Sequence, residues 1–213
     1  MRSLLVVVPV LALLASGCKK EDDTTPPVVT PPPPAFTLTL NGNQGVEMLI
    51  DGGMVTVGES VDVVPFFEED GVLNTPPELS TRFYGAGLYN ATADANAFLM
   101  RIGTLDFEGP VVLPDDFWAF FVTGTRVYGS ASGGLDGLEL EWTDGDGTVW
   151  STRCASGVQS GSAFTITEVM TDADKLGTVA RIKAAFNCKL YNCITGATKT
   201  VSSGLLVLQF RDF

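Results

Sequence analysis

The chain has 213 residues, with 25 acidic and 13 basic side chains and no histidine, so its net charge at pH 7 is −12. Such a negative field repels nucleic acid and anionic lipid, and neither is expected as a partner. The missing histidine removes the commonest general base and metal ligand and excludes Ser–His catalysis. No phosphate loop or dinucleotide fingerprint occurs in the sequence, so we expect neither a metal nor a cofactor.

Residues 1–17 are typical of a signal peptide. Arg2 supplies a positive start, and residues 4–14 form an apolar run interrupted only by Pro9. A run of this length is too short to span a bilayer, which takes roughly 20 residues, but it suits the apolar region of a signal peptide. Three small residues, 15–17, then precede Cys18.

The residues around Cys18 resemble the bacterial lipobox. The resemblance implies cleavage before Cys18 and attachment of lipid to it, which makes Cys18 the first residue of the mature chain and its membrane contact. Ala15 stands where the lipobox usually has leucine. Ala15 and Gly17 also satisfy the rule for ordinary secretory cleavage at the same bond, so a simple secretion signal is the alternative.

A charged and proline-rich linker is expected at residues 18–35. Residues 19–23, Lys-Lys-Glu-Asp-Asp, resemble the signal that sends many Bacteroidota lipoproteins to the outer face of the outer membrane. A generic charged spacer is the alternative. Six prolines lie within residues 24–35, and polyproline II geometry gives residues 19–35 a reach on the order of 50 Å.

We expect one all-β domain at residues 36–213. Strict apolar–polar alternation predicts a strand at 36–40, and Pro65 restricts the run 61–67 to a sheet edge or a break. Loops are predicted at 70–71 and 74–77 from their turn-forming residues. Further strands are predicted at 46–50, 54–57, 81–89, 97–105 and 126–130.

One short helix is predicted at residues 113–122, ending near Gly124. Pro114 suits the first helical position, and Asp115 and Asp116 suit a helix N-terminus. Phenylalanines 117, 120 and 121 fall at helical spacing. Such a stripe usually packs on the core, so we expect it to cover the core rather than to hold a ligand.

Residues 138–154 predict a hairpin with a defined register. Apolar residues alternate along 138–142, and their faces match the return strand only if Trp142 opposes Trp150. That register requires a three-residue loop, 145–147, with Gly147 in the left-handed region. Asp144 and Asp146 look like half a calcium loop, but Ala155 occupies the place of its closing glutamate, so a turn is expected.

The C-terminal part predicts a meander of strands at 163–169, 179–191 and 205–210. Counting strands places Cys154 and Cys193 at the same end and Cys188 deeper, facing the core. A disulfide between Cys154 and Cys193 is therefore preferred, and three free thiols are the alternative. The spacing of strands and turns predicts an antiparallel β-sandwich or open barrel with this meander and the one short helix.

Residues 137–152, 159–168 and 186–191 resemble a family of uncharacterised Bacteroidota lipoproteins. The last of these segments, Phe-Asn-Cys-Lys-Leu-Tyr, is similar to the Phe-x-Cys-x-Leu-Tyr strand of that family's final hairpin. The resemblance covers roughly the last ninety residues and the anchor. It implies a fold and a lineage, and no activity.

Two classes of function remain, with a purely structural envelope protein as a third. A non-enzymatic surface module would bind a glycan, a peptide or a protein, and Trp118 and Tyr128 are candidates for apolar contact. A carboxylate-dependent hydrolase such as a glycosidase is the alternative, with carboxylates at 139 and 141 or at 115 and 116. Solvated carboxylates are far commoner than catalytic pairs, so we assign no catalytic residue and do not expect an enzyme.

Overall fold

The computed structural model describes residues 35–130 and 136–213. These form one antiparallel sheet of eleven strands and one helix, which confirms the all-β class. The elements are β1 (Gly45–Ile50), β2 (Gly53–Gly58), β3 (Val63–Val72), β4 (Ser80–Asn90), β5 (Ala97–Phe107), α1 (Pro114–Phe120), β6 (Gly124–Arg126), β7 (Gly137–Thr143), β8 (Val149–Ser151), β9 (Ala163–Asp174), β10 (Gly177–Asn192) and β11 (Thr198–Asp212).

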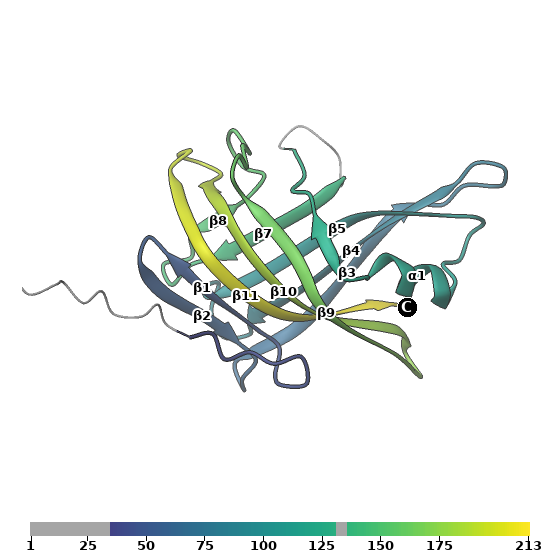
Figure 1. Ribbon diagram of the computed structural model, residues 1–213, viewed down its shortest axis with the longest axis horizontal. Coiled ribbons are helices and arrows are strands. Elements are labelled where there is room, and N and C mark those ends of the chain that lie inside the picture. Colours follow the sequence, from purple (N-terminus) through teal and green to yellow (C-terminus); the bar gives the residue numbers. More distant parts are fainter. Residues whose placement is uncertain (1–34, 131–135) are drawn as a thin grey trace, which may run out of the picture. The chain divides into compact units, whose positions relative to one another are not determined.

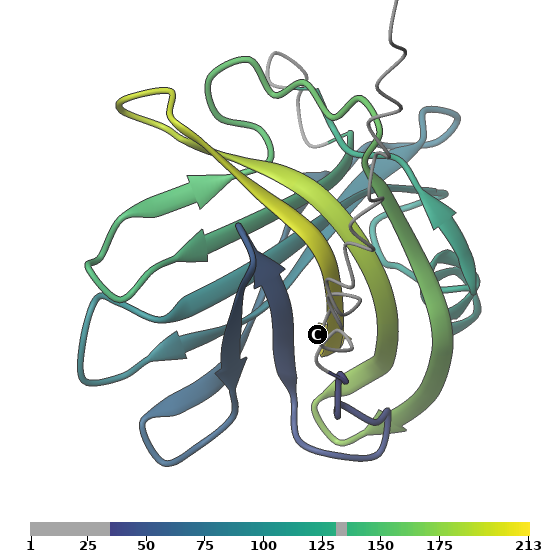
Figure 2. The same ribbon diagram turned by 60° about the vertical axis from the view of Figure 1, so that its left-hand side comes forward.

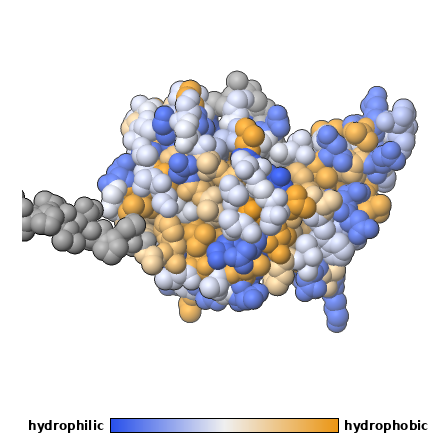
Figure 3. Space-filling view, in the orientation of Figure 1, coloured by the Kyte–Doolittle hydropathy of each residue, from blue (hydrophilic) through white to orange (hydrophobic). Residues whose placement is uncertain are grey.

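The sheet curls at β10, where it branches. Its main path runs β2-β1-β11-β10-β8-β7-β5-β4-β3, while β9 pairs with β10 and β6 pairs with β9. The first part of β10, up to Asn187, pairs with β9, and its last two residues pair with β8. The sheet therefore forms an open half-barrel whose two halves face each other (Figure 1, Figure 2). Two hairpins, β3–β4 and β9–β10, project from it and have hydrophilic tips (Figure 3).

One hydrophobic core fills the space between the two halves of the sheet. Alternation along β10 buries Ala180, Ile182 and Ala184 completely, while Arg181 and Lys183 lie on the other face. The predicted meander β9–β10–β11 is thus confirmed, with one apolar face and one polar face.

Helix α1 closes the core with aromatic side chains. Pro114 lies in its first turn with two acidic residues, as predicted. Phe117 and Phe121 are almost fully buried, and their rings lie 5.0 Å and 5.8 Å from the ring of Tyr84. The ring of Phe121 also packs 4.7 Å from that of Phe210 on β11. The prediction that this stripe covers the core is confirmed.

The β7–β8 hairpin has the predicted register, with Trp142 opposite Trp150. The backbone N–H of Asp144 donates to the carbonyl of Thr148, which leaves residues 145–147 as the loop. Gly147 has a φ of 78°, in the left-handed region that glycine tolerates. The Asp144 carboxylate accepts hydrogen bonds from the backbone N–H groups of Asp146 and Thr148 and from the Trp150 indole, so it serves the turn.

Cys154 and Cys193 form a disulfide, the pair preferred from the strand count, with their Cα atoms 4.8 Å apart. Cys188 is a free thiol on the core face of β10 and is 3% exposed. Burial raises its pKa to about 12, so it remains a protonated core residue.

Three of the sequence predictions are wrong. Residues 36–40 do not form a strand: the N–H and hydroxyl of Thr37 donate to the Glu47 carboxylate, at 2.6 Å and 2.5 Å, and this segment lies across β1. Residues 70–71 belong to β3, because its pairing with β4 continues to the end of the strand. In the predicted strand 126–130 only Arg126 is paired in a strand, as the last residue of β6. The edge position of β3, predicted from Pro65, is confirmed.

The predicted signal peptide, the lipid site at Cys18 and nearly all of the predicted linker fall in residues 1–34, outside the described ranges. Within those ranges, no helix has the length and apolar character needed to span a membrane.

Candidate ligand-binding face

The outward surface of β3, β4, β5 and β7 carries two pocket regions joined by a charged strip, and is called the candidate face below. Core residues on β4 alternate with outward-facing ones. Tyr84, Ala86 and Leu88 are buried in the core, so residues 83, 85, 87 and 89 face outward. The outward row reads Phe-x-Gly-x-Gly-x-Tyr, with an aromatic residue at each end and glycine between.

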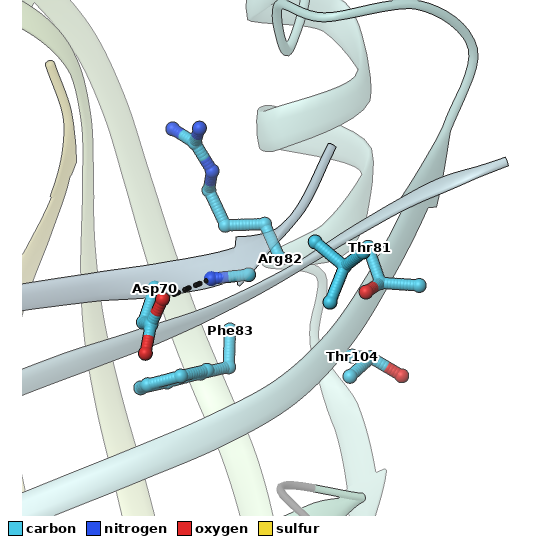
Figure 4. A pocket seen from close by; sticks show the side chains of 7 residues that line it. Asp70, Thr81, Arg82, Phe83 and Thr104 are labelled. Atoms are coloured by element: carbon cyan, nitrogen blue, oxygen red, sulfur yellow. Dashed lines mark hydrogen bonds between the residues drawn. The ribbon is translucent and has the colours of Figure 1, made fainter. Parts of the chain in front are cut away.

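The first pocket surrounds Phe83 and has a volume of about 230 Å³. Figure 4 shows the Phe83 ring next to Asp70, with Thr81 and Thr104 on the other side. The Arg82 side chain points away from them, toward the interior, where it donates to Asp212. The pocket therefore combines an aromatic ring, a carboxylate and two threonine hydroxyls, contributed by β3, β4 and β5.

The second pocket region lies at the other end of β4, around Tyr89. Tyr89 is 46% exposed, and its ring packs edge-on against Phe66 with the ring centres 5.8 Å apart. Two adjoining hollows of about 80 and 260 Å³ share Tyr89, Ala97 and Thr143. Glu141 lines the smaller hollow, and Asp94 lines the larger one.

A charged strip lies on the strands between the two pocket regions. The Arg101 guanidinium contacts Glu68 at 2.9 Å, Glu139 at 3.4 Å and Glu141 at 3.7 Å. Glu139 also accepts a hydrogen bond of 2.9 Å from the Ser151 hydroxyl. The structure therefore brings together the two glutamates offered as a catalytic pair, but it places both beside one cation.

Glycines on β4 allow this strip to be flat. A Cβ at Gly85 would lie 2.9 Å from the Glu68 Cβ, and a Cβ at Gly87 would lie 2.6 Å from the Phe66 ring. Both distances are shorter than side chains tolerate, so only glycine lets Phe66 and Glu68 extend across β4. This crossing brings the Glu68 carboxylate to Arg101 on β5.

The charges of the strip depend on one another. Burial raises the pKa of Glu141, and the neighbouring Glu139 adds to this effect while Arg101 opposes it. For Arg101, burial favours the neutral form, but the hydrogen bond and charge of Glu68 outweigh it and raise the pKa. Arg101 therefore stays charged and holds the carboxylates together.

The two glutamates offered as a catalytic pair are ion-paired to the same guanidinium. A glycosidase needs two carboxyl groups that flank the bond being cleaved, one as acid and one as base or nucleophile. Glu139 and Glu141 instead lie on the same strand face and share the Arg101 guanidinium. Asp115 and Asp116 stand in the first turn of α1, where they suit the helix N-terminus.

The two aromatic residues offered for ligand contact do not line either pocket region. Trp118 and Tyr128 are partly buried and pack against the core. The Tyr128 hydroxyl donates to the backbone carbonyl of Asn187 at 3.1 Å. The aromatic residues that line the two pocket regions are Phe83, which is partly buried, and Tyr89, which is exposed. The alternation in residues 81–89 was the signal that could have identified them.

Comparison of the chain with protein-family models, with curated proteins and with solved structures finds no match. The fold defines the class of protein, an all-β half-barrel. Inferences about function therefore depend on the candidate face and on the N-terminal sequence.

Proposed function

We propose that this protein is a lipid-anchored, outward-facing outer-membrane protein that binds a carbohydrate through the candidate face and does not cleave it. The apolar run before Cys18 and the charged residues after it support the anchor and the location. The resemblance of the C-terminal segments to Bacteroidota lipoproteins supports the same location.

The observation that carries the binding proposal is the pocket around Phe83. A sugar ring offers an apolar face of C–H groups and a rim of hydroxyls. The Phe83 ring suits the apolar face, while the Asp70 carboxylate and the hydroxyls of Thr81 and Thr104 suit the rim. Ligand sites commonly combine aromatic surface with a few polar groups in this way.

A screen of carbohydrates tests the binding proposal. The unacylated mature chain, residues 18–213 with Cys18→Ser, is applied to a glycan array next to the same chain with Phe83→Ala. Loss of the aromatic contact is expected to weaken binding about tenfold or more. Phe213→Ala is the matched control, because Phe213 is 64% exposed and packs on Phe67, which points to the opposite side of β3. A blank array would contradict carbohydrate binding.

The anchor and the absence of catalysis have separate tests. Labelling with radioactive palmitate should mark the natural chain and not the Cys18→Ala variant, and label retained in that variant would mean that Cys18 is not the lipid site. Incubation with each bound glycan should release no new reducing ends. Release that disappears in Glu139→Gln or Glu141→Gln would favour the hydrolase instead.

A further inference from the structure

We infer that the ligand is an extended polysaccharide, neutral or amine-bearing, that lies along β4 and occupies both pocket regions at once. This inference rests on the proposed carbohydrate binding and adds the length and the charge of the ligand. It follows from the spacing of the two pockets, from the surface between them and from the charge of the candidate face.

The two pocket regions lie too far apart for one sugar to fill both. Phe83 and Tyr89 belong to the same outward row of β4 and are separated by six residues. A strand rises about 3.3 Å per residue, so their Cα atoms lie about 20 Å apart. Only a ligand of several linked sugar units reaches from one ring to the other.

The surface between the two rings suits a chain lying flat. The outward residues of β4 between Phe83 and Tyr89 are Gly85 and Gly87, and both are buried. The side chains of Phe66 and Glu68 extend over them and form the surface between the two rings. A polymer along β4 would therefore meet apolar ring surface and carboxylate oxygens in turn, which fits a chain of hydroxyl-bearing rings.

The charge of the candidate face selects against polyanions. Carboxylates outnumber the guanidinium groups of Arg101 and Arg153 in the pockets and the strip, and three of the carboxylates already contact Arg101. The acidic residues concerned are Glu68, Asp70, Asp94, Glu139 and Glu141. Uronate or sulfate groups would be repelled here, as they would be by the net charge of −12, whereas hydroxyl and ammonium groups would donate to these oxygens.

If the ligand occupies both pocket regions at once, its binding affinity should depend steeply on its length. Once the first ring is bound, the second binding event becomes intramolecular, which raises the overall affinity by a factor of about 10²–10⁴. A disaccharide fills one pocket and should bind weakly. Oligomers long enough to span about 20 Å along β4 should bind at least about a hundredfold more tightly.

Titration calorimetry with a size series of one polysaccharide tests the inference, using the same unacylated mature chain. Affinity should rise by about a hundredfold between the disaccharide and an oligomer that spans both rings. Phe83→Ala and Tyr89→Ala should each remove most of that gain for the long oligomer, while Phe213→Ala should not. Unchanged urea unfolding of each variant shows that the loss is not a loss of folding.

The outcomes separate this inference from the proposed function. Equal affinity for the disaccharide and the long oligomer, or a response to only one of the two aromatic substitutions, would overturn the extended ligand and leave carbohydrate binding intact. Tighter binding of a uronate-containing polymer than of a neutral or amine-bearing polymer of the same length would overturn the charge argument. No binding of any oligosaccharide would refute the proposed function itself.

Discussion

Replacement of Cys154 and Cys193 by serine is expected to lower the free energy of unfolding substantially. Their disulfide spans a sequence separation of 39 residues, a stretch that contains all of β9 and β10. In the unfolded chain the cross-link removes loop-closure entropy that grows with the logarithm of loop length. For this separation, removing the cross-link should lower the free energy of unfolding by about 4 kcal/mol at 25 °C.

Urea unfolding followed by circular dichroism measures this difference. The double variant Cys154→Ser/Cys193→Ser should unfold at lower urea than the natural chain, and reductant should lower the stability of the natural chain without affecting the double variant. The variant should also give a larger dependence of free energy on urea, because its unfolded state is less compact. Cys188→Ala is the control, since it removes a thiol and keeps the cross-link.

A free-energy difference below about 1 kcal/mol would refute the reasoning. It would mean that the two chain segments are already held together in the unfolded state, or that the cross-link is absent from the folded protein. Mass measurement after alkylation, with and without reductant, distinguishes these two explanations.

Two further predictions concern the ion pair between Arg211 and Asp174 and a glycine. The hydrogen bond from Arg211 holds the pKa of Asp174 at about 2, so this ionised carboxylate stabilises the fold above its ordinary pKa of 3.8, and the contribution is lost as pH falls from 3.8 toward 2. NMR of the carboxyl groups should show that Asp174 titrates with this midpoint, and Arg211→Gln should return the midpoint toward 3.8. An unchanged midpoint in the variant would contradict the pairing. Gly87→Ala should destabilise the domain by about 1–3 kcal/mol because its Cβ would lie 2.4 Å from the backbone carbonyl oxygen of Phe98 and 2.6 Å from the Phe66 ring. Gly58→Ala, with no atom within 4 Å, should have little effect in the same urea assay, and equal effects would contradict this prediction.

Features controlled by neighbouring residues could be predicted from the sequence. The Trp142–Trp150 register followed because both strands have one apolar face, so a slip by one residue would bury charge. Helix α1 followed from Pro114 and the spacing of its phenylalanines. In both cases the constraint lies within about twenty residues of sequence.

Features that depend on a distant partner could not be predicted. Residues 36–40 alternate like a strand, yet their N–H groups bind the Glu47 carboxylate, which is 8% exposed and needs donors. Asp70 and Gly71 look like a turn, but pairing with β4 overrides that preference. A Cβ at Gly71 would lie 2.0 Å from the Thr81 carbonyl oxygen, so this glycine serves close packing rather than a turn.

The same distinction decides how the glutamates of β7 are interpreted. Their alternate spacing was enough to place Glu139 and Glu141 on one face of a strand, and so to suggest a catalytic pair. Their chemistry depends on Arg101, which lies directly opposite Glu139 on β5 and which no local pattern could assign to them. Because the guanidinium contacts Glu68 as well, the carboxylates form one ion-paired array with oxygens on the sheet surface. Such an array can accept hydrogen bonds from a bound sugar, whereas a nucleophile or general acid would have to be released from the array before it could act.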